Sequence, residues 1–211
     1  MFSIIVVHYQ GVNSHEVFCK GIDSILSQTF TDYEILAYHD GPLLDSSADM
    51  PVPVICTEKR HNDWGHSLRD RGIQDAKGRY ILHFNADNVL YANALEEITK
   101  EIERPPRFYD GQGRPLDTDD IIIFPILLMG MQLFRNMYLR AKGVRSFYMI
   151  QTGNPPVAHY IDCMQLVMKR ALWLREGGWY DRRDMSDGYM YQAFAEKYGY
   201  RTVGTVLGEH H

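Results

Sequence analysis

The sequence of 211 residues lacks most of the features that mark secreted or nucleic-acid-binding proteins. It has three cysteines, which are far apart and odd in number, and it has no Asn-x-Ser/Thr sequon. This pattern favours reduced thiols in a cytoplasmic protein over a disulfide framework. The formal net charge is −5, so no basic surface is expected. We therefore expect no nucleic-acid partner.

Long apolar runs are also missing. The most apolar stretch, 121–134, is interrupted by Pro125, Gly130 and Gln132 and is shorter than the about 20 residues that a membrane span needs. It is instead typical of a buried strand that runs into a helix. The first residues have no basic flank of the kind found in signal peptides, so they are predicted to form a strand. We therefore expect a soluble protein with no integral membrane segment.

What is present is enough apolar material for one core. Hydrophobic residues make up 45% of the chain and aromatic residues 12%, which together with the length predicts a single domain over residues 1–211. The first half alternates strands (2–7, 33–38, 52–57, 80–84) with helices (14–27, 67–76). Such alternation predicts an α/β fold with a mostly parallel sheet and right-handed crossovers.

The second half is less regular. Apolar spacing predicts a helix over 90–102, and Pro, Gly and Asp predict a surface loop over 104–120. Residues 135–160 are predicted to be irregular. A strand over 161–168, helices over 169–176 and 187–198, and a last strand over 202–206 are expected to complete the domain.

The stretch 78–88 contains the first candidate for a functional site. A short apolar strand, 80–84, stops on Asn85-Ala86-Asp87-Asn88. Ligands of open α/β sheets bind at the carboxyl ends of strands, and carboxylate and amide oxygens suit Mg²⁺ or Mn²⁺ that carries phosphate oxygens. An Asx turn that starts the next helix is an equally good reading of these residues alone.

Two earlier strands also end in polar tips, at Tyr9 and at Asp40. In a parallel sheet these ends meet at one edge together with Asp87. Tyr9 is suited to stack on a nucleobase, Asp40 to accept its N–H groups, and Arg69 to neutralise phosphate. Each of these residues alone is also common in loops that have no binding role.

The order of these segments resembles that of glycosyltransferase family 2 enzymes of the GT-A fold. The matching segments span nearly the whole chain: His8-Tyr9-Gln10, His39-Asp40-Gly41-Pro42, Leu68-Arg69-Asp70-Arg71-Gly72-Ile73, Phe84-Asn85-Ala86-Asp87-Asn88, Gly177-Gly178-Trp179-Tyr180-Asp181 and Ser186-Asp187. Two positions depart from the family. Asn85 replaces the first Asp of its Asp-x-Asp motif, and Ser186 replaces a Glu, so the resemblance implies weakened metal binding.

The resemblance implies a Rossmann-like, mostly parallel sheet flanked by helices, with residues 1–104 as the half that binds the nucleotide sugar and residues 105–211 as the acceptor half. By the same resemblance, Tyr9 and Asp40 hold the base and Arg69 holds the nucleotide. In the Asn85-Ala86-Asp87 turn, Asn85 contacts a ribose or donor-sugar hydroxyl and Asp87 holds Mn²⁺ or Mg²⁺. Asp187 is expected to be the general base, although without the family it reads as a helix N-cap.

Several residues near the end of the chain remain open to two readings. His210 follows the last strand, where related enzymes place a metal ligand, but it also fits a loose polar tail or a tag remnant. His211 is a weaker candidate. Trp179 and His159 are candidates for the acceptor side, with Asp162 as a further pocket residue, although all three fit structural roles as well. Trp64 and Trp173 are expected to pack.

The implied function is metal-dependent transfer of a sugar from a nucleotide-sugar donor, such as UDP-glucose, to an acceptor hydroxyl with inversion. The acceptor is expected to be a glycan, a lipid-linked molecule or a small molecule. A retaining GT-A enzyme and a non-catalytic module that binds nucleotide sugars or glycans are the alternatives. A nucleotidyltransferase is disfavoured, because residues 8–13 lack a glycine-rich phosphate loop with a lysine.

Overall fold

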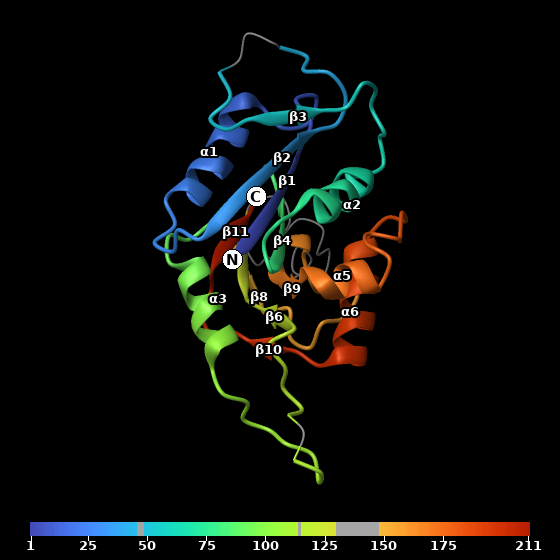
Figure 1. The fold of residues 1–211 in the computed structure, drawn as a ribbon. Helices are drawn as coiled ribbons and strands as arrows, with labels where there is room; N and C mark the ends of the chain where they lie inside the picture. Colours follow the sequence, from blue (N-terminus) through green and yellow to red (C-terminus); the bar gives the residue numbers. More distant parts are fainter. Residues whose placement is uncertain (46–48, 114, 130–147) are drawn as a thin grey trace, which may run out of the picture.

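The computed structural model describes residues 1–45, 49–113, 115–129 and 148–211. Among these residues, seven strands form the central sheet, in the order β10-β6-β9-β4-β1-β2-β3 (Figure 1). Their bounds are β1 (Phe2–His8), β2 (Tyr33–His39), β3 (Val54–Cys56), β4 (Tyr80–Asn85), β6 (Ile121–Ile123), β9 (Leu166–Lys169) and β10 (Arg201–Thr202). Strand β1 pairs in parallel with β2 and β4, whereas β9 runs antiparallel to β4 and β6. The predicted mostly parallel α/β sheet is confirmed.

Helices cover both faces of this sheet. On one face lie α1 (His15–Leu26) and α3 (Ala94–Glu103), and on the other lie α2 (His66–Asp75), α5 (Arg170–Arg175) and α6 (Ser186–Tyr198) (Figure 1). Strand β1 supplies both cores, since Ile4 and Val6 pack under α1 while Ile5 packs under α2. This is why its sequence reads as continuously apolar rather than alternating.

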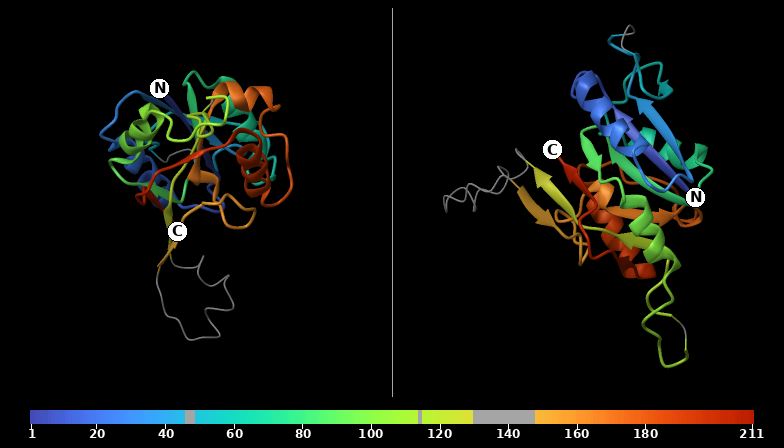
Figure 2. Two further views of the ribbon diagram at one scale, coloured as in Figure 1. Left: turned by 90° about the horizontal axis from the view of Figure 1, so that it is seen from below. Right: turned by 90° about the vertical axis from the view of Figure 1, so that its left-hand side faces the viewer.

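A smaller sheet stands beside the first. Within the described part of the chain it has four strands in the order β5-β11-β7-β8, which are β5 (Asn88–Leu90), β7 (Ile126–Met129), β8 (Tyr148–Gln151) and β11 (Gly208–His210) (Figure 2). Its strand β5 follows β4 after a two-residue turn. The end of the chain is therefore brought next to the Asn85–Asn88 turn.

The registers of the parallel strands align their carboxyl ends. His8 lies opposite His39, and Val7 lies opposite Asn85. The residues that follow, Tyr9 and Asp40, therefore lie at the same edge of the sheet as the turn at residues 86 and 87. The predicted meeting of three strand ends at one edge of the sheet is confirmed.

Helix α1 illustrates how local sequence sets an element. It begins after Ser14, whose hydroxyl accepts a hydrogen bond from the Val17 amide as an N-cap. Its buried residues, Phe18, Ile22 and Ile25, recur at helical spacing. The helix ends at Leu26, as the sequence predicted to within a residue.

Several predicted elements are wrong in detail. The helix expected over 90–102 begins at Ala94, because Asn88–Leu90 pairs with β11 instead. The strand expected over 161–168 begins only at Leu166, after a 3₁₀ turn, Cys163–Gln165, that Asp162 caps. The last strand is replaced by β10 and β11.

The apolar stretch 121–134 starts as the two strands β6 and β7, and the helix expected to follow lies outside the described residues, as does 135–147. Strand β8 falls within a segment predicted to be irregular. No helix in the described ranges is long and apolar enough to cross a membrane.

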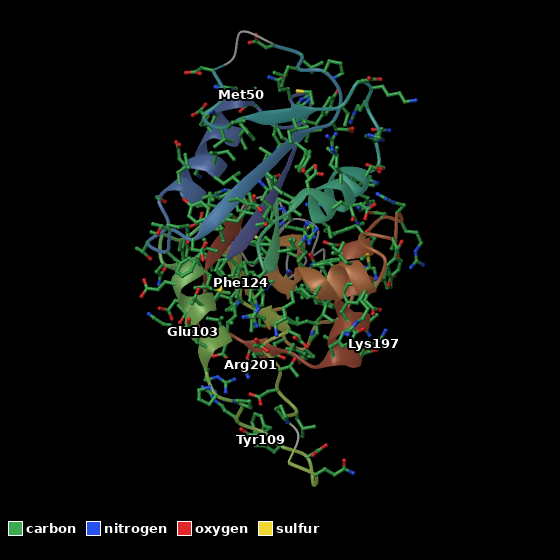
Figure 3. The ribbon with its side chains drawn as sticks, viewed as in Figure 1. Met50, Glu103, Tyr109, Phe124, Lys197 and Arg201 are labelled. Atoms are coloured by element: carbon green, nitrogen blue, oxygen red, sulfur yellow. The ribbon has the colours of Figure 1, made fainter. Side chains whose placement is uncertain are left out.

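The predicted surface loop 104–120 extends from the body as an arm that carries Tyr109 (Figure 3). Its base is tied down by Arg201, whose guanidinium donates to the carbonyls of Arg104 and Asp117. The carboxylate of Asp117 also accepts the amides of Arg107 and Phe108. Burial opposes its charge, yet these hydrogen bonds lower the pKa of Asp117 to about 2.

Candidate active site

A cleft of about 1040 Å³ opens at the carboxyl ends of β1, β2 and β4. This is at the upper end of the range for ligand-binding clefts, which is about 300–1,000 Å³. Apart from His211, which is exposed and bonds to Glu209, the residues that the sequence analysis proposed for the donor, the metal, the base and the acceptor all line it: Tyr9, Asp40, Arg69, Asn85, Ala86, Asp87, His159, Asp162, Trp179, Asp187 and His210. The structure therefore brings these candidates together in one place.

One end of the cleft is formed by Tyr9 and Asp40. The two oxygens of Asp40 accept the amides of His61 and Asn62 at 2.7 and 3.0 Å, so this carboxylate organises the segment after β3. The Arg60 guanidinium lies 3.7 Å from the centre of the Tyr9 ring and 3.6 Å from Asp40. Since a carboxylate has about four acceptor positions, Asp40 retains capacity for a ligand donor.

His39 lies behind these two residues and is fully buried. The Gln10 amide donates to its Nε2 at 3.0 Å, which requires the proton to be on Nδ1. That Nδ1–H then donates to the Gly41 carbonyl at 2.8 Å. A neutral His39 thus ties the tip of β1 to the tip of β2.

Arg69 lies in the floor of the cleft. It comes from the first turn of α2 and is 4% exposed. Its Nη2 donates to Asn85 Oδ1 at 2.5 Å, and its guanidinium lies 5.3 Å from the Trp179 ring. Nη1 has no hydrogen-bond partner among the described residues. A buried guanidinium with an open donor is suited to bind an anion such as phosphate.

Asp87 is placed in the turn between β4 and β5. Its Oδ1 is buried and has no hydrogen-bond partner within the described part of the chain. His210 lies on β11, the strand next to β5, where it pairs with Asn88, the residue after Asp87. Its Nδ1–H donates to Asp162 Oδ2 at 2.6 Å.

Two further carboxylates, Asp162 and Asp187, line the cleft. Asp162 is held by the 3₁₀ turn, where its Oδ1 accepts the Met164 amide at 3.0 Å. Burial opposes its charge, but His210 and the Met164 amide outweigh burial and lower the pKa of Asp162. The pKa of Asp187, at the start of α6, shifts in the opposite direction. Burial and the nearby Asp162 charge raise the pKa of Asp187 to about 6.

The two proposed acceptor residues differ in exposure. Trp179 is 1% exposed, and the rings of His66 and Trp173 are stacked parallel to it at 5.7 and 5.6 Å. Its Nε1–H donates to Ser186 Oγ at 3.1 Å. Ser186, which stands where the family has an acid, thus completes an aromatic cluster. His159 is exposed at the mouth, with Nε2 bonded to the Tyr189 hydroxyl at 3.2 Å.

Four residues around the cleft were missed or underrated from the sequence. Arg60 lies in no motif, His39 lies in a matched segment but was given no role, and Trp64 was expected to pack although it is 74% exposed. Asp162 gave a weak signal, because its partner His210 is 48 positions away along the chain. The polar residues next to the matched strand tips would have been the best guide to Arg60 and His39.

The fold and the cleft together define an α/β protein with a buried arginine in the floor and carboxylates in the lining of a cleft at the carboxyl edge of its sheet. Sequence comparison agrees with this class and narrows it. Residues 3–174 match the family described as Glycosyl transferase family 2. Because this match covers most of the chain, the protein belongs to that family.

Curated relatives are glycosyltransferases described as uncharacterized. YwdF of Bacillus subtilis is 31% identical over 107 residues, which are 48% of this chain and 38% of YwdF. RP339 of Rickettsia prowazekii is 28% identical over 127 residues, which are 59% of this chain and 35% of RP339. The matched region thus covers little more than a third of either relative.

Solved structures show the same fold. Residues 1–349 of S. aureus TarS superpose with a TM-score of 0.65 and 12% identity, over 99% of this chain and 60% of that one. The mannosyltransferase PcManGT of Pyrobaculum calidifontis, solved with GDP-Man and Mn²⁺, gives a TM-score of 0.59 and 15% identity, over 97% and 54% of the two chains. The predicted GT-A fold is confirmed.

Proposed function

We propose that this domain transfers a sugar from a nucleotide-sugar donor to an acceptor hydroxyl. The observation that carries the proposal is the meeting of Tyr9, Asp40 and Asp87 at the ends of three parallel strands, with Arg69 and Asp187 in the same cleft. Family membership supports it. TarS has been solved with UDP and with UDP-GlcNAc, and PcManGT with GDP-Man, which favours a nucleotide-linked donor here.

The base end of the cleft is suited to a pyrimidine. Asp40 offers carboxylate oxygens for a ring N–H, and Tyr9 offers an aromatic face. Arg60 covers that face in the structure, so base stacking there requires Arg60 to move aside or the base to use the other face. A UDP-sugar such as UDP-glucose is the donor we propose, with residues 1–104 forming its half of the site and residues 105–211 the acceptor half.

The cleft also fits a divalent cation. Asp87 presents a buried, unpartnered oxygen, which suits Mn²⁺ or Mg²⁺, and His210 on the adjacent strand presents an imidazole, which favours Mn²⁺ over Mg²⁺. No group of three or more His, Cys, Asp or Glu residues forms a metal site within the described ranges. Asp87 and His210 would therefore hold the ion together with diphosphate oxygens. Once bound, the ion would neutralise charge on the leaving diphosphate.

Arg69 can also neutralise the negative charge of the diphosphate, and it does not need a metal to do so. Its free Nη1–H points to a phosphate role, while Asn85 fixes the guanidinium through Nη2. Because Asn85 is already an acceptor for Arg69, its amide is best read as the group that positions this cation. Its remaining N–H groups can still reach a ribose or sugar hydroxyl.

Asp187 is the proposed base. In the transfer, the acceptor oxygen forms a bond to the anomeric carbon as the bond from that carbon to the diphosphate oxygen breaks, and the hydroxyl proton passes to Asp187. A carboxylate with a pKa near 6 is a stronger base than an ordinary one and is still ionised at neutral pH. Attack opposite the leaving group gives inversion.

The test is release of nucleoside diphosphate from UDP-glucose, UDP-N-acetylglucosamine and GDP-mannose in the presence of Mn²⁺. We expect release from at least one UDP-sugar, and NMR of the transferred sugar should show an inverted anomeric centre. A retained configuration would favour a retaining enzyme. Binding of UDP-sugar with neither transfer nor hydrolysis would favour the non-catalytic module.

A further inference from the structure

Trp64 is the most unusual aromatic residue of the cleft. The chain has three tryptophans, and Trp173 and Trp179 are 0% and 1% exposed, whereas Trp64 is 74% exposed and lines the cleft. A large apolar ring that is held in water contributes little to folding. Packing therefore does not explain why this residue is there.

The backbone at Trp64 is also unfavourable for its side chain. Its φ is +59°, in the left-handed region, and Gly65 follows with a φ of +80°. For a bulky residue this conformation costs free energy, whereas glycine adopts it readily. Strained, exposed residues of this kind occur where a side chain serves a ligand.

Neighbouring contacts fix the position of Trp64 along the cleft. The segment is anchored at the base end by Asp40, which accepts the Asn62 amide. At its other end, the His66 ring bonds to the Arg183 carbonyl at 3.1 Å, in the loop that leads to Asp187. Trp64 thus stands between the nucleotide residues and the proposed base.

The cleft that Trp64 lines has the mixed character that a sugar needs. Tyr160, which is 70% exposed, lines the same cleft, and Asp184 and His159 supply polar groups to its lining. A pyranose has one face of C–H groups and a rim of hydroxyls, so it can stack on an aromatic ring while its hydroxyls bind polar side chains. A lipid tail would instead require a contiguous apolar surface.

We propose that Trp64 is a stacking platform for a pyranose ring of the acceptor, so that the acceptor is a sugar-bearing molecule. This inference rests on the proposed glycosyltransferase function and adds the acceptor class to it. The ring presents the sugar to Asp187, which takes the proton from one of its hydroxyls.

The experiment uses Trp64 as its own reporter. Because the other two tryptophans are buried, acrylamide quenching of fluorescence reports mainly on Trp64. Methyl glucopyranoside, methyl mannopyranoside and methyl N-acetylglucosaminide are added to the protein in the presence of UDP and Mn²⁺. We expect at least one pyranoside to reduce quenching severalfold, while UDP alone leaves it unchanged. Octanol serves as the lipid-like control and should not protect.

Two variants complete the test. Trp64→Gly removes the ring at a backbone position that glycine prefers, so thermal stability should be kept or raised. Calorimetric affinity for the protecting pyranoside should fall on the order of tenfold, with UDP affinity within about twofold of wild type. Trp64→Phe should retain most of the pyranoside affinity.

Three results would overturn the inference. They are protection by UDP alone with weakened UDP binding in Trp64→Gly, no protection by any pyranoside although UDP binds, and a marked loss of stability in Trp64→Gly. Failure of UDP itself to bind is a separate result, because it would contradict the proposed function as well.

Discussion

Asp187 is the single side chain on which the proposed chemistry depends most. Its Oδ1 accepts the Gly188 amide at 2.9 Å, a hydrogen bond that an asparagine oxygen can also accept. We expect Asp187→Asn to lower turnover by about 10²–10⁴-fold with donor affinity nearly unchanged, because positioned acid–base catalysis contributes that much. Steady-state kinetics with UDP titration checks both parts. Full activity in this variant would remove Asp187 from the reaction.

The same side chain predicts a pH dependence. The base must be ionised, so turnover should rise with pH and level off above the pKa of Asp187, which is about 6. The Asp162 charge is one cause of that high pKa, so Asp162→Asn should move the rising limb to lower pH. A pH profile of turnover for both proteins checks the shift. A limb that stays in place would show that Asp162 does not act on Asp187.

Stability should respond to Asp187 in the opposite direction to activity. The folded pKa of about 6 exceeds the ordinary value of 3.8, so the folded state loses stability as pH rises from 3.8 to 6. By linkage, the ionised Asp187 lowers the free energy of unfolding above pH 6 by on the order of 3 kcal/mol. Asp187→Asn should therefore raise the melting temperature at pH 7, with the gain fading near pH 4. Equal melting temperatures at pH 7 would contradict the burial of this charge.

For single residues, the sequence predicted those site candidates that can be recognised from their neighbours in the chain. Tyr9, Asp40 and Asp87 follow apolar strands, and alternation of strands with helices implies that such ends meet. The contact between Asp162 and His210 could not be predicted, because it depends on how β11 enters the second sheet. The exposure of Trp64 and the burial of Trp179 could likewise not be predicted from the sequence, since both are tryptophans beside glycine.

At the scale of elements, helix α1 packs closely against the turn after β4. A Cβ placed on Gly21 of α1 would come within 2.7 Å of the Ala86 carbonyl oxygen, so glycine lets the helix approach the turn that carries Asp87. We expect Gly21→Ala to cost about 1–3 kcal/mol of stability through overpacking, and to weaken UDP binding because the turn is displaced.

Chemical denaturation and calorimetry measure these two effects. Asp23→Ala, on the exposed side of the same helix, is the matched control and should stay within about 0.5 kcal/mol of wild type. Unchanged stability and UDP affinity in Gly21→Ala would show that the close approach is not needed.

The elements that sequence predicted well are those with complete local signals, such as α1 with its Ser14 cap. Strands β5 and β11 were missed because each has three residues and exists through its partner in the second sheet. Long-range pairing of this kind leaves little local pattern.

On the scale of the whole molecule, two apolar cores cover one sheet on both faces, and a second sheet lies beside it (Figure 2). This second sheet contributes Leu128, Met149, Gln151 and His210 to the lining of the cleft. This arrangement places nucleotide-binding candidates from the first half of the chain opposite Asp162, Asp187 and His210 from the second half. We propose that these groups together bind a nucleoside diphosphate through a divalent ion.

The most direct test of this binding is a calorimetric titration of UDP in the presence and absence of Mn²⁺. We expect UDP binding that strengthens with Mn²⁺ in the wild type and in Asp23→Ala, and an affinity at least about tenfold lower in Asp87→Ala, whose thermal stability should be nearly unchanged. No UDP binding by the wild type, or equal Mn²⁺-dependent affinity in Asp87→Ala, would contradict it.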